Sequence, residues 1–570
     1  MPRRRPTKDG TVDDYTYDLG SHSRRVTTDS AEAQRWFDRG LAWTYGFHHE
    51  EAVACFEAAT AADPDCAMAH WGIAYALGPN YNKPWEFFDD EDLARTVERT
   101  HAAVELAHEK AKAGSTPVEQ ALISALRDRY PQAEAVEDCA VWNEPYAEAM
   151  RAVHELAPHD PDIAALYADA LMNLTPWQLW DLRTGQPAEG ARTTEAKAVL
   201  DAALATDAGS RHPGVLHFYV HLMEMSPTPE AALPVGDRLR GLVPDAGHLQ
   251  HMPSHLEVLC GDYRRVVSDN TAAIAADEKF RARKGPLNFY TLYRAHNHHF
   301  KIYGAMFLGQ YRTALETAAQ LEAAIPEELL RVQSPPMADW LEGFLAMRVH
   351  VLIRFGRWTD ILDLPLPADP RLYCVTTAML HYARGVAYAA TGRVPQAEEE
   401  RRLFRTACAR VPGTRMLFNN TCADILAVAS AMLDGELAYR KGDHAAAFTA
   451  LERSVALDDN LPYDEPWGWM QPTRHAYGAL LLEQGRVAEA EAVYRADLGL
   501  DDTLPRALQH PGNVWSLHGL HECLVRLGRT GEARIVGQQL RFATALADVP
   551  VEASCYCRLE VNGEDGGGCC

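Results

Sequence analysis

The chain has 570 residues, with 55 Lys or Arg against 79 Asp or Glu, so its net charge is −24 when His is neutral. This acidic balance argues against a nucleic-acid partner and against an anionic membrane surface, because both require a basic face that displaces counterions. With 47% hydrophobic and 24% charged residues, the composition is that of a globular protein and excludes disorder for most of the chain.

The N-terminal stretch is polar and lacks the apolar core of a signal peptide, and no later segment reaches the roughly 20 apolar residues that span a bilayer. The twelve cysteines are mostly isolated within helix-like segments, which favours reduced thiols over a disulfide framework. We therefore expect a cytoplasmic protein without a membrane partner. Phosphate-binding and dinucleotide-binding glycine motifs are absent from the sequence, so no nucleotide cofactor is expected.

A repeat pattern begins near residue 31. Its spacing fits two antiparallel helices, which need small residues where they cross and a proline where the second helix ends. The first copy consists of Trp36, Gly40, Trp43, Ala52, Phe56, Ala59 and Pro64. Further copies are marked by Gly385, Gly392 and Ala397, by Gly435, Gly442 and Ala447, by Gly478, Gly485, Ala490 and Tyr494, and by Gly528 and Ala533. The chain thus resembles the tetratricopeptide-repeat (TPR) superfamily, which implies an all-α superhelix, or α-solenoid, of helical hairpins.

The repeats divide the chain into five expected segments. These are a flexible N-terminal tail at 1–28, TPR-like helical repeats at 29–206, degenerate His-rich TPR-like repeats at 207–330, C-terminal TPR repeats at 331–549, and a flexible Cys- and Gly-rich tail at 550–570. Three Pro-Trp pairs interrupt the repeats at 84–85, 176–177 and 466–467. Each Trp either caps the hydrophobic seam at a linker or forms a wall of a binding groove.

Nine of the 24 histidines lie between residues 212 and 299. Their spacing places each set on one face of a helix, at steps of three, four and seven residues. The sets are His217, His221 and Glu224; His248, His251 and His255; and His296, His299 and Tyr303. We count three repeats in this segment, which begin at residues 213, 247 and 295, with an insertion at 281–294 before the third. Within these repeats the residues of the three sets occupy positions 2, 5, 9 and 12. The TPR resemblance implies that these positions line the concave groove.

Imidazole is the commonest protein ligand of transition metals, and paired His at i and i+4 on a helix chelate well. The set is too large for one coordination shell, so one or two ions of Cu, Fe or Zn are expected, with Cu or Zn favoured over Mg, Ca or Mn. The expected ligands are His217, His221, His251, His255, His296 and His299. Glu224 is expected as a ligand or general base, and Tyr303 and Tyr293 as hydrogen-bonding or proton-donating neighbours. The spacing leaves open whether His248 and His298 are ligands, neighbours of ligands or core residues.

Two functions follow from different classes. The first is a metal-dependent enzyme that acts on a small molecule or peptide in the concave groove, with oxidoreductase chemistry favoured over hydrolysis; metal storage or sensing shares the same features. The second is a TPR adaptor that binds a peptide or partner protein. The segments FDRGLAWTYGFHHEEAVACF, WGIAYALGPNYNKPWE and HMPSH resemble a group of full-length bacterial and fungal TPR proteins, and the chain is more distantly similar to the tetratricopeptide repeat protein 38 group. Neither resemblance implies a reaction.

Overall fold

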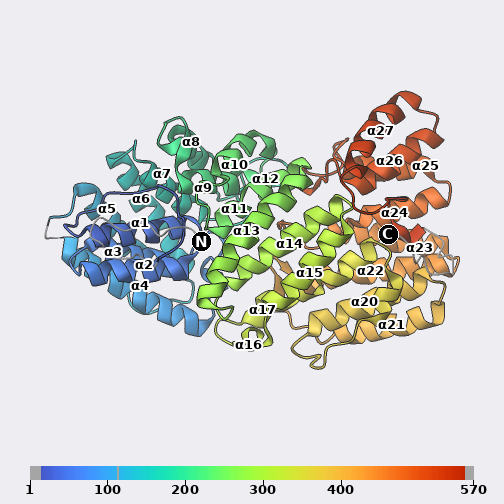
Figure 1. The fold of residues 1–570 in the computed structure, drawn as a ribbon, viewed down its shortest axis with the longest axis horizontal. Helices are drawn as coiled ribbons and strands as arrows, with labels where there is room; N and C mark the ends of the chain where they lie inside the picture. Colours follow the sequence, from blue (N-terminus) through green and yellow to red (C-terminus); the bar gives the residue numbers. More distant parts are fainter. Residues whose placement is uncertain (1–14, 112–113, 559–570) are drawn as a thin grey trace.

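The computed structural model describes residues 15–111 and 114–558. Within these residues the chain is an all-α solenoid, as the repeat pattern predicts, and its only strands form a short antiparallel hairpin, β1 (Met416–Leu417) and β2 (Asn420–Thr421). Figure 1 shows the N-terminal helices at one end of an elongated molecule, the C-terminal helices at the other, and α13 and α14 between them. Successive helices pack against each other, as in other solenoids.

The bounds of the helices follow in chain order. The N-terminal part contains α1 (Ala31–Tyr45), α2 (His49–Ala62), α3 (Ala67–Leu77), α4 (Asp90–Ala111), α5 (Pro117–Arg129), α6 (Asn143–Leu156), α7 (Pro161–Met172) and α8 (Thr193–Leu204). The central part contains α9 (Pro213–Glu224), α10 (Leu233–Leu239), α11 (Gly247–His251), α12 (Pro253–Cys260), α13 (Tyr263–Lys284), α14 (Thr291–Phe307), α15 (Tyr311–Ala324) and α16 (Glu327–Leu330).

The C-terminal part contains α17 (Met337–Leu341), α18 (Met347–Arg354), α19 (Trp358–Asp363), α20 (Cys374–Ala390), α21 (Val394–Cys408), α22 (Cys422–Arg440), α23 (His444–Asp458), α24 (Thr473–Glu483), α25 (Val487–Asp497), α26 (Val514–Arg526) and α27 (Thr530–Thr544). Short 3-10 helices are η1 (Trp85–Phe87), η2 (Cys139–Trp142), η3 (Gly209–Arg211), η4 (Pro229–Ala232), η5 (Glu342–Ala346), η6 (Arg506–Leu508) and η7 (Tyr556–Arg558). Among the described residues, no helix has both the length and the apolar character needed to cross a bilayer.

The glycines of the repeat pattern lie where helices cross. A Cβ atom on Gly40 of α1 would lie 2.6 Å from the ring of Phe56 on α2, and one on Gly72 of α3 would lie 2.5 Å from the same ring. The ring of Phe56 therefore fits between α1 and α3 only because both positions lack a side chain. This is the close helix crossing that the TPR spacing predicts.

We expect Gly40→Ala to lower the free energy of unfolding by about 1–3 kcal/mol, because the new methyl group has no room beside Phe56. Gly531→Ala on α27 is the matched control, since no neighbouring atom lies within 4 Å of a Cβ there. Because alanine has the higher helix propensity, this control is expected to be neutral or slightly stabilising. Thermal unfolding followed by circular dichroism measures both, and equal melting temperatures would contradict the close crossing.

The structure corrects the expectation of flexible tails at two places. Residues 15–28 pack on the N-terminal helices: Tyr15 and Val26 are buried, and Trp43 donates a hydrogen bond of 2.5 Å to the Tyr15 hydroxyl. At the other end, Ser554 is buried and hydrogen-bonded to Tyr494. A few apolar side chains and hydroxyl groups within these mostly polar segments thus attach both segments to the neighbouring helices. Residues 1–14 and 559–570, with the remainder of each expected tail, lie outside the described residues.

Buried apolar side chains form two large clusters. One runs from Tyr15 to Tyr293, and the other runs from Val258 to Cys557. They interleave along α12–α14, within the His-rich segment 207–330 that the sequence singles out. The histidines of that segment therefore lie where the two halves of the core meet, and the three-way division into 29–206, 207–330 and 331–549 stays a prediction.

Candidate metal centre

Six buried histidines form two groups of three. The first contains His217 and His221 of α9 and His248 of α11. The second contains His251 of α11, His255 of α12 and His296 of α14. In each group, one ring nitrogen from every member lies within 4.8 Å of the others, which is close enough for one ion to bind all three after small movements.

The two groups are neighbours. The ring centroids of His221 and His255 are 5.6 Å apart, and those of His248 and His251 are 5.8 Å apart. Inside the groups the Nε2 atoms face each other, at 3.1 Å between His217 and His248 and at 2.7 Å between His251 and His255. The arrangement therefore offers two adjacent three-nitrogen sites.

The local sequence places these rings. Pro213 starts α9, and its His212 N-cap accepts a hydrogen bond from the Val215 amide, which fixes the helix that carries His217 and His221. The sequence predicts one continuous helix for His248, His251 and His255, but the structure divides it at Met252 into α11 and α12. Pro253 causes the break because it has no amide hydrogen to donate.

Four of the six rings are held through Nδ1. The Nδ1 atoms of His217 and His251 lie 2.6 Å from the Tyr45 carbonyl oxygen and 2.7 Å from Asn270 Oδ1. Glu224 binds the other two, with Oε1 2.9 Å from Nδ1 of His221 and Oε2 2.7 Å from Nδ1 of His255. Because these oxygens only accept, each Nδ1 carries a hydrogen atom and each Nε2 of a neutral ring presents a lone pair. In metal sites, oxygen acceptors that bind the Nδ1–H of a histidine orient its ring so that Nε2 faces the metal.

Asn270 of α13 is itself fixed in one orientation. Its side-chain amide donates to the carbonyl oxygen of Val266 at 2.8 Å and to the hydroxyl of Ser254 at 3.0 Å. Both donors are therefore engaged, and Oδ1 is left to accept from His251. A ring position set through two successive hydrogen bonds indicates a pre-organised site.

His255 differs from the other five because two carboxylates meet its Nδ1. Glu465, from the loop between α23 and α24, lies 2.5 Å away, in addition to Glu224 at 2.7 Å. Burial acts to lower the pKa of His255, but Glu465 and Glu224 outweigh it and raise that pKa to about 10. Burial and the Glu465 carboxylate also raise the pKa of Glu224 well above its ordinary value. A charged His255 ring can donate from Nε2 to His251, so a proton occupies the position that a cation would take.

Burial keeps the other five rings neutral. It lowers the pKa of His217 to about 3 and places the pKa values of His221, His248, His251 and His296 well below the ordinary value. Within the described part of the chain, His221 Nε2, His248 Nδ1 and His296 Nδ1 have no hydrogen-bond partner. Buried polar atoms are nearly always satisfied, so these nitrogens remain free to bind a ligand or a water molecule.

The structure separates some of the predicted residues from this centre. His299 belongs to neither group; its ring packs on Phe344, and both ring nitrogens lack a partner among the described residues. Tyr303 stacks on Phe307 with ring centroids 4.3 Å apart. His298 donates Nδ1–H to the Arg294 carbonyl oxygen at 2.8 Å. Tyr293 lies beside the centre, 5.1 Å from the ring of His248. His248, which the sequence left open, completes the first group.

Three aromatic residues around the centre have left-handed backbones. Among the described residues, Phe47, Trp177 and Phe418 are the only non-glycine residues with positive φ, at 51°, 60° and 47°. Phe47 lies 4.6 Å from the ring of His217, Trp177 lies 5.9 Å from His221, and Phe418 lies 4.5 Å from His296. A bulky residue adopts this conformation only at a cost of about 1–3 kcal/mol, and such strain concentrates at functional sites.

A cavity of about 370 Å³ reaches the second group. His255, His296 and Glu465 line it together with aromatic side chains that include Trp177, Phe418 and Tyr293. Of the three Pro-Trp pairs, the one at 176–177 thus contributes to a cavity wall, while Trp85 is buried against Trp142 and Trp467 packs on His510. The cavity gives a small molecule a route to His255 and His296.

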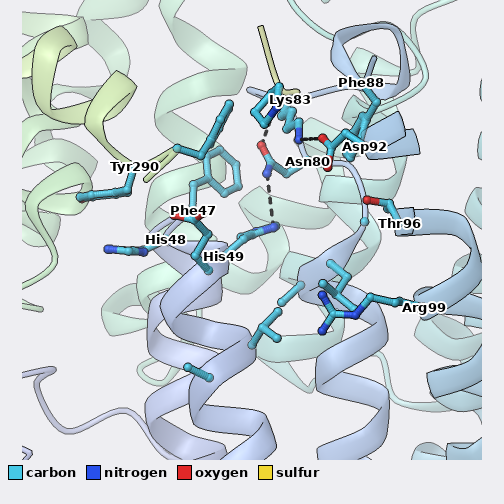
Figure 2. Close-up of a pocket in the computed structure, with 18 of the residues that line it drawn as sticks. Phe47, His48, His49, Asn80, Lys83, Phe88, Asp92, Thr96, Arg99 and Tyr290 are labelled. Carbon is cyan, nitrogen blue, oxygen red and sulfur yellow. Dashed lines mark hydrogen bonds and ion pairs between the residues drawn. The ribbon is translucent and has the colours of Figure 1, made fainter. Parts of the chain in front are cut away.

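A second cavity, of about 430 Å³, lies on the other side of Phe47. Figure 2 shows His48, His49, Lys83, Asp92 and Arg99 around it. Its basic groups are already paired: Lys83 with Asp92 at 2.6 Å, Arg99 with Glu57 at 3.3 Å, and Arg95 with Glu91 at 2.6 Å. Phe47 lines this cavity and also contacts His217, so its ring separates the second cavity from the first His group.

A third set of potential ligands, His22, Asp162 and His212, is structural. Asp162 accepts hydrogen bonds from Tyr45, His212 and His22 at 2.6, 2.9 and 3.1 Å, and Arg24 is 3.1 Å from its other oxygen. The carboxylate is therefore saturated, and the positive charge of Arg24 disfavours a metal there.

Several residues of the centre could not be found from the sequence spacing. Asn270, Glu465, Phe47 and Phe418 come from other elements, and only the folded chain brings them to the histidines. Only Glu465 has a marker in the sequence, because it directly precedes the Pro-Trp pair at 466–467. From the sequence, the Trp of such a pair is expected either to cap the hydrophobic seam at a linker or to form a wall of a binding groove.

Comparisons with known proteins give no family for the chain. A scan against known protein families and a search of curated proteins found no match. Solved structures with some similarity include the Cut9–Hcn1 hetero-tetramer of the APC/C, at 13% identity and a TM-score of 0.31, covering 87% of this chain and 78% of that one. Two IFIT1 monomeric mutants, with Gppp-AAAA and with m7Gppp-AAAA, are 11% identical at TM-scores of 0.32 and 0.34, covering 84% of this chain and 90% of theirs.

Proposed function

We propose that the protein is a metal-dependent oxidoreductase whose two His groups bind two transition-metal ions and act on a small molecule. The observation that supports this most is the pair of three-imidazole groups with Nδ1 atoms held by Tyr45, Glu224 and Asn270. Three protein ligands leave a coordination position open, which is typical of catalytic sites rather than structural ones.

The donor set favours copper or zinc. Each group offers three imidazole nitrogens, and hard ions such as Mg²⁺ and Ca²⁺ prefer oxygen ligands. Non-haem iron enzymes commonly add a carboxylate to two histidines, whereas both oxygens of Glu224 already accept from ring Nδ1 atoms. Copper would supply one-electron chemistry with O₂ as the acceptor.

The same contacts favour oxidoreduction over hydrolysis. A metal-assisted hydrolase needs a base that takes a proton from water. Glu224 is occupied by His221 and His255, and Glu465 accepts the Tyr463 hydroxyl at 2.5 Å and meets His255 with its other oxygen. We therefore assign Glu224 a positioning role in place of the base that the sequence suggested, and Tyr303 has no direct role.

The test is metal content after loading the metal-free protein with Cu²⁺, Zn²⁺ or Fe²⁺, followed by elemental mass spectrometry. We expect about two equivalents in the native chain and about one in each of two double variants, H217A/H221A and H251A/H296A, because each removes two of the three ligands of one group. His159→Ala, at an exposed position, is the matched control and should retain both ions.

Activity separates an enzyme from a metal store. The copper-loaded protein should consume O₂ with 4-methylcatechol. Two catechol molecules each lose two electrons and two protons to give two quinones, while one O₂ is reduced to two water molecules. Both double variants should lose this activity. Absence of bound metal in the native chain would overturn the proposal and leave the solenoid as a scaffold for a peptide or protein partner. Bound metal without any turnover would point to storage or sensing.

We also infer a reducing compartment such as the cytoplasm. The cysteines that the structure describes are free, and several of them are buried. The three sequence segments quoted above support a relationship to the bacterial and fungal TPR group, and the chain is more distantly similar to the tetratricopeptide repeat protein 38 group. A reaction established for either group would be a candidate reaction for this chain.

A further inference from the structure

The cavity beside the second His group has a chemical character of its own. Its walls include the half-buried aromatic side chains of Phe88, Phe289, Trp340, Trp177 and Phe418. The rings of Phe289 and Trp340 meet edge to face, with centroids 5.5 Å apart. Half-buried rings present faces on which a flat molecule can stack. A volume of about 370 Å³ suits a molecule of one or two rings.

Acidic side chains outnumber basic ones along the cavity. Its described lining includes Glu86, Asp89, Asp339, Asp464 and Glu465 and contains neither Lys nor Arg. Asp339 is neutralised by Arg415 at 2.5 Å, and Glu465 by His255. Asp464 is buried and accepts a hydrogen bond from Asn420 at 3.0 Å. Glu86 is exposed and Asp89 half-buried, so these two carboxylates lie toward the solvent end, whereas His255 and His296 form the buried end.

The Asp89 carboxylate is engaged through one oxygen. Its Oδ1 accepts from the amides of Glu91 and Asp92 and from the Ser334 hydroxyl, at 3.0, 3.1 and 2.8 Å. Its Oδ2 has no hydrogen-bond partner among the described residues. A cation would gain from both the carboxylates and the ring faces at the solvent end of the cavity.

We propose that the substrate is a small aromatic cation, a phenol or catechol whose side chain carries an ammonium group. Its ring stacks among Trp340, Phe289 and Phe418 with the hydroxyl end toward His255 and His296, and its ammonium group lies near Glu86 and Asp89. This inference rests on the proposed function for the identity of the cavity as a substrate site.

Isothermal titration of the metal-free full chain with tyramine and with 4-hydroxyphenylacetate tests the proposal, because the two probes share a phenol ring and differ in the sign of their charge. We expect tyramine to bind at least about tenfold more tightly. In E86Q/D89N this preference should fall below about threefold, and asparagine at position 89 retains the helix cap of α4. In Trp340→Ala both probes should bind about tenfold more weakly, since a stacking surface is lost.

Glu98→Gln, on the exposed side of α4, is the control and should leave the preference unchanged. Equal binding of the two probes, tighter binding of the anion, or an unchanged preference in E86Q/D89N would each overturn the proposal. Because binding is measured without metal, failure of the metal-content test leaves this result intact. Failure of tyramine to bind overturns the substrate class while leaving the metal centre in place.

Discussion

Glu224→Gln is expected to weaken metal binding at one of the two His groups by about 10–100-fold. The carboxylate of Glu224 accepts Nδ1–H from His221 in the first group and from His255 in the second. A glutamine side chain has one accepting oxygen and one donating amide nitrogen. One of the two imidazoles would therefore face a donor with its own N–H, and its ring would turn away from the metal position.

Competition with a chelator of known affinity measures this loss for Cu²⁺ and Zn²⁺. Glu342→Gln is the matched control, because Glu342 is equally buried and accepts hydrogen bonds from Thr376 and Val375 in the C-terminal part. It is expected to lower stability without changing metal affinity. If Glu224→Gln bound both ions as tightly as the native chain, the shared carboxylate would have no positioning role.

Acid should unfold the metal-free protein steeply below about pH 6. In ten histidines burial lowers the pKa below the ordinary value of about 6.5: His48, His49, His217, His221, His248, His251, His296, His299, His350 and His475. The unfolded chain takes up protons at these positions as the pH falls through 6.5, while the folded chain does not. The free energy of unfolding therefore decreases as the pH is lowered, by up to about 1.4 kcal/mol per pH unit for each histidine.

Ten such groups together exceed the typical total stability of about 5–15 kcal/mol within one to two pH units. His255 has the opposite sign, because its pKa is raised to about 10, but it is a single group. Circular dichroism against pH, with and without bound metal, measures the transition. Bound metal should move the midpoint to lower pH, since ligated nitrogens resist protonation. A metal-free protein that keeps its helices at pH 4 would contradict the neutral buried histidines.

The repeat class could be predicted from sequence because it depends on local spacing. The fit of Phe56 between Gly40 and Gly72 is a contact within two neighbouring hairpins, so a 34-residue pattern is enough to indicate it. The same locality explains why His217 and His221 on α9, or His251 and His255 across Met252, could be paired in advance. His251 and His255 stay close across the break at Met252, with ring centroids 4.6 Å apart.

The grouping of the histidines could not be predicted, because it depends on how helices cross. His248 and His251 are three residues apart on α11, yet they belong to different groups. His299 is three residues from His296 on α14 but faces Phe344 instead of the centre. Glu465 is separated from His255 by more than 200 residues and reaches it only because the C-terminal helices pack back on the centre, as the hydrogen bond from Trp515 to the Met306 carbonyl oxygen also shows.

The left-handed backbones of Phe47, Trp177 and Phe418 also bear on how such a chain responds to selection. Glycine at any of the three positions would relieve backbone strain of about 1–3 kcal/mol, and would at the same time remove a ring that encloses the histidines. Selection for heat resistance alone would therefore favour chains with an open, water-filled centre. The three strained rings thus enclose the histidines at a cost in stability that glycine at these positions would avoid.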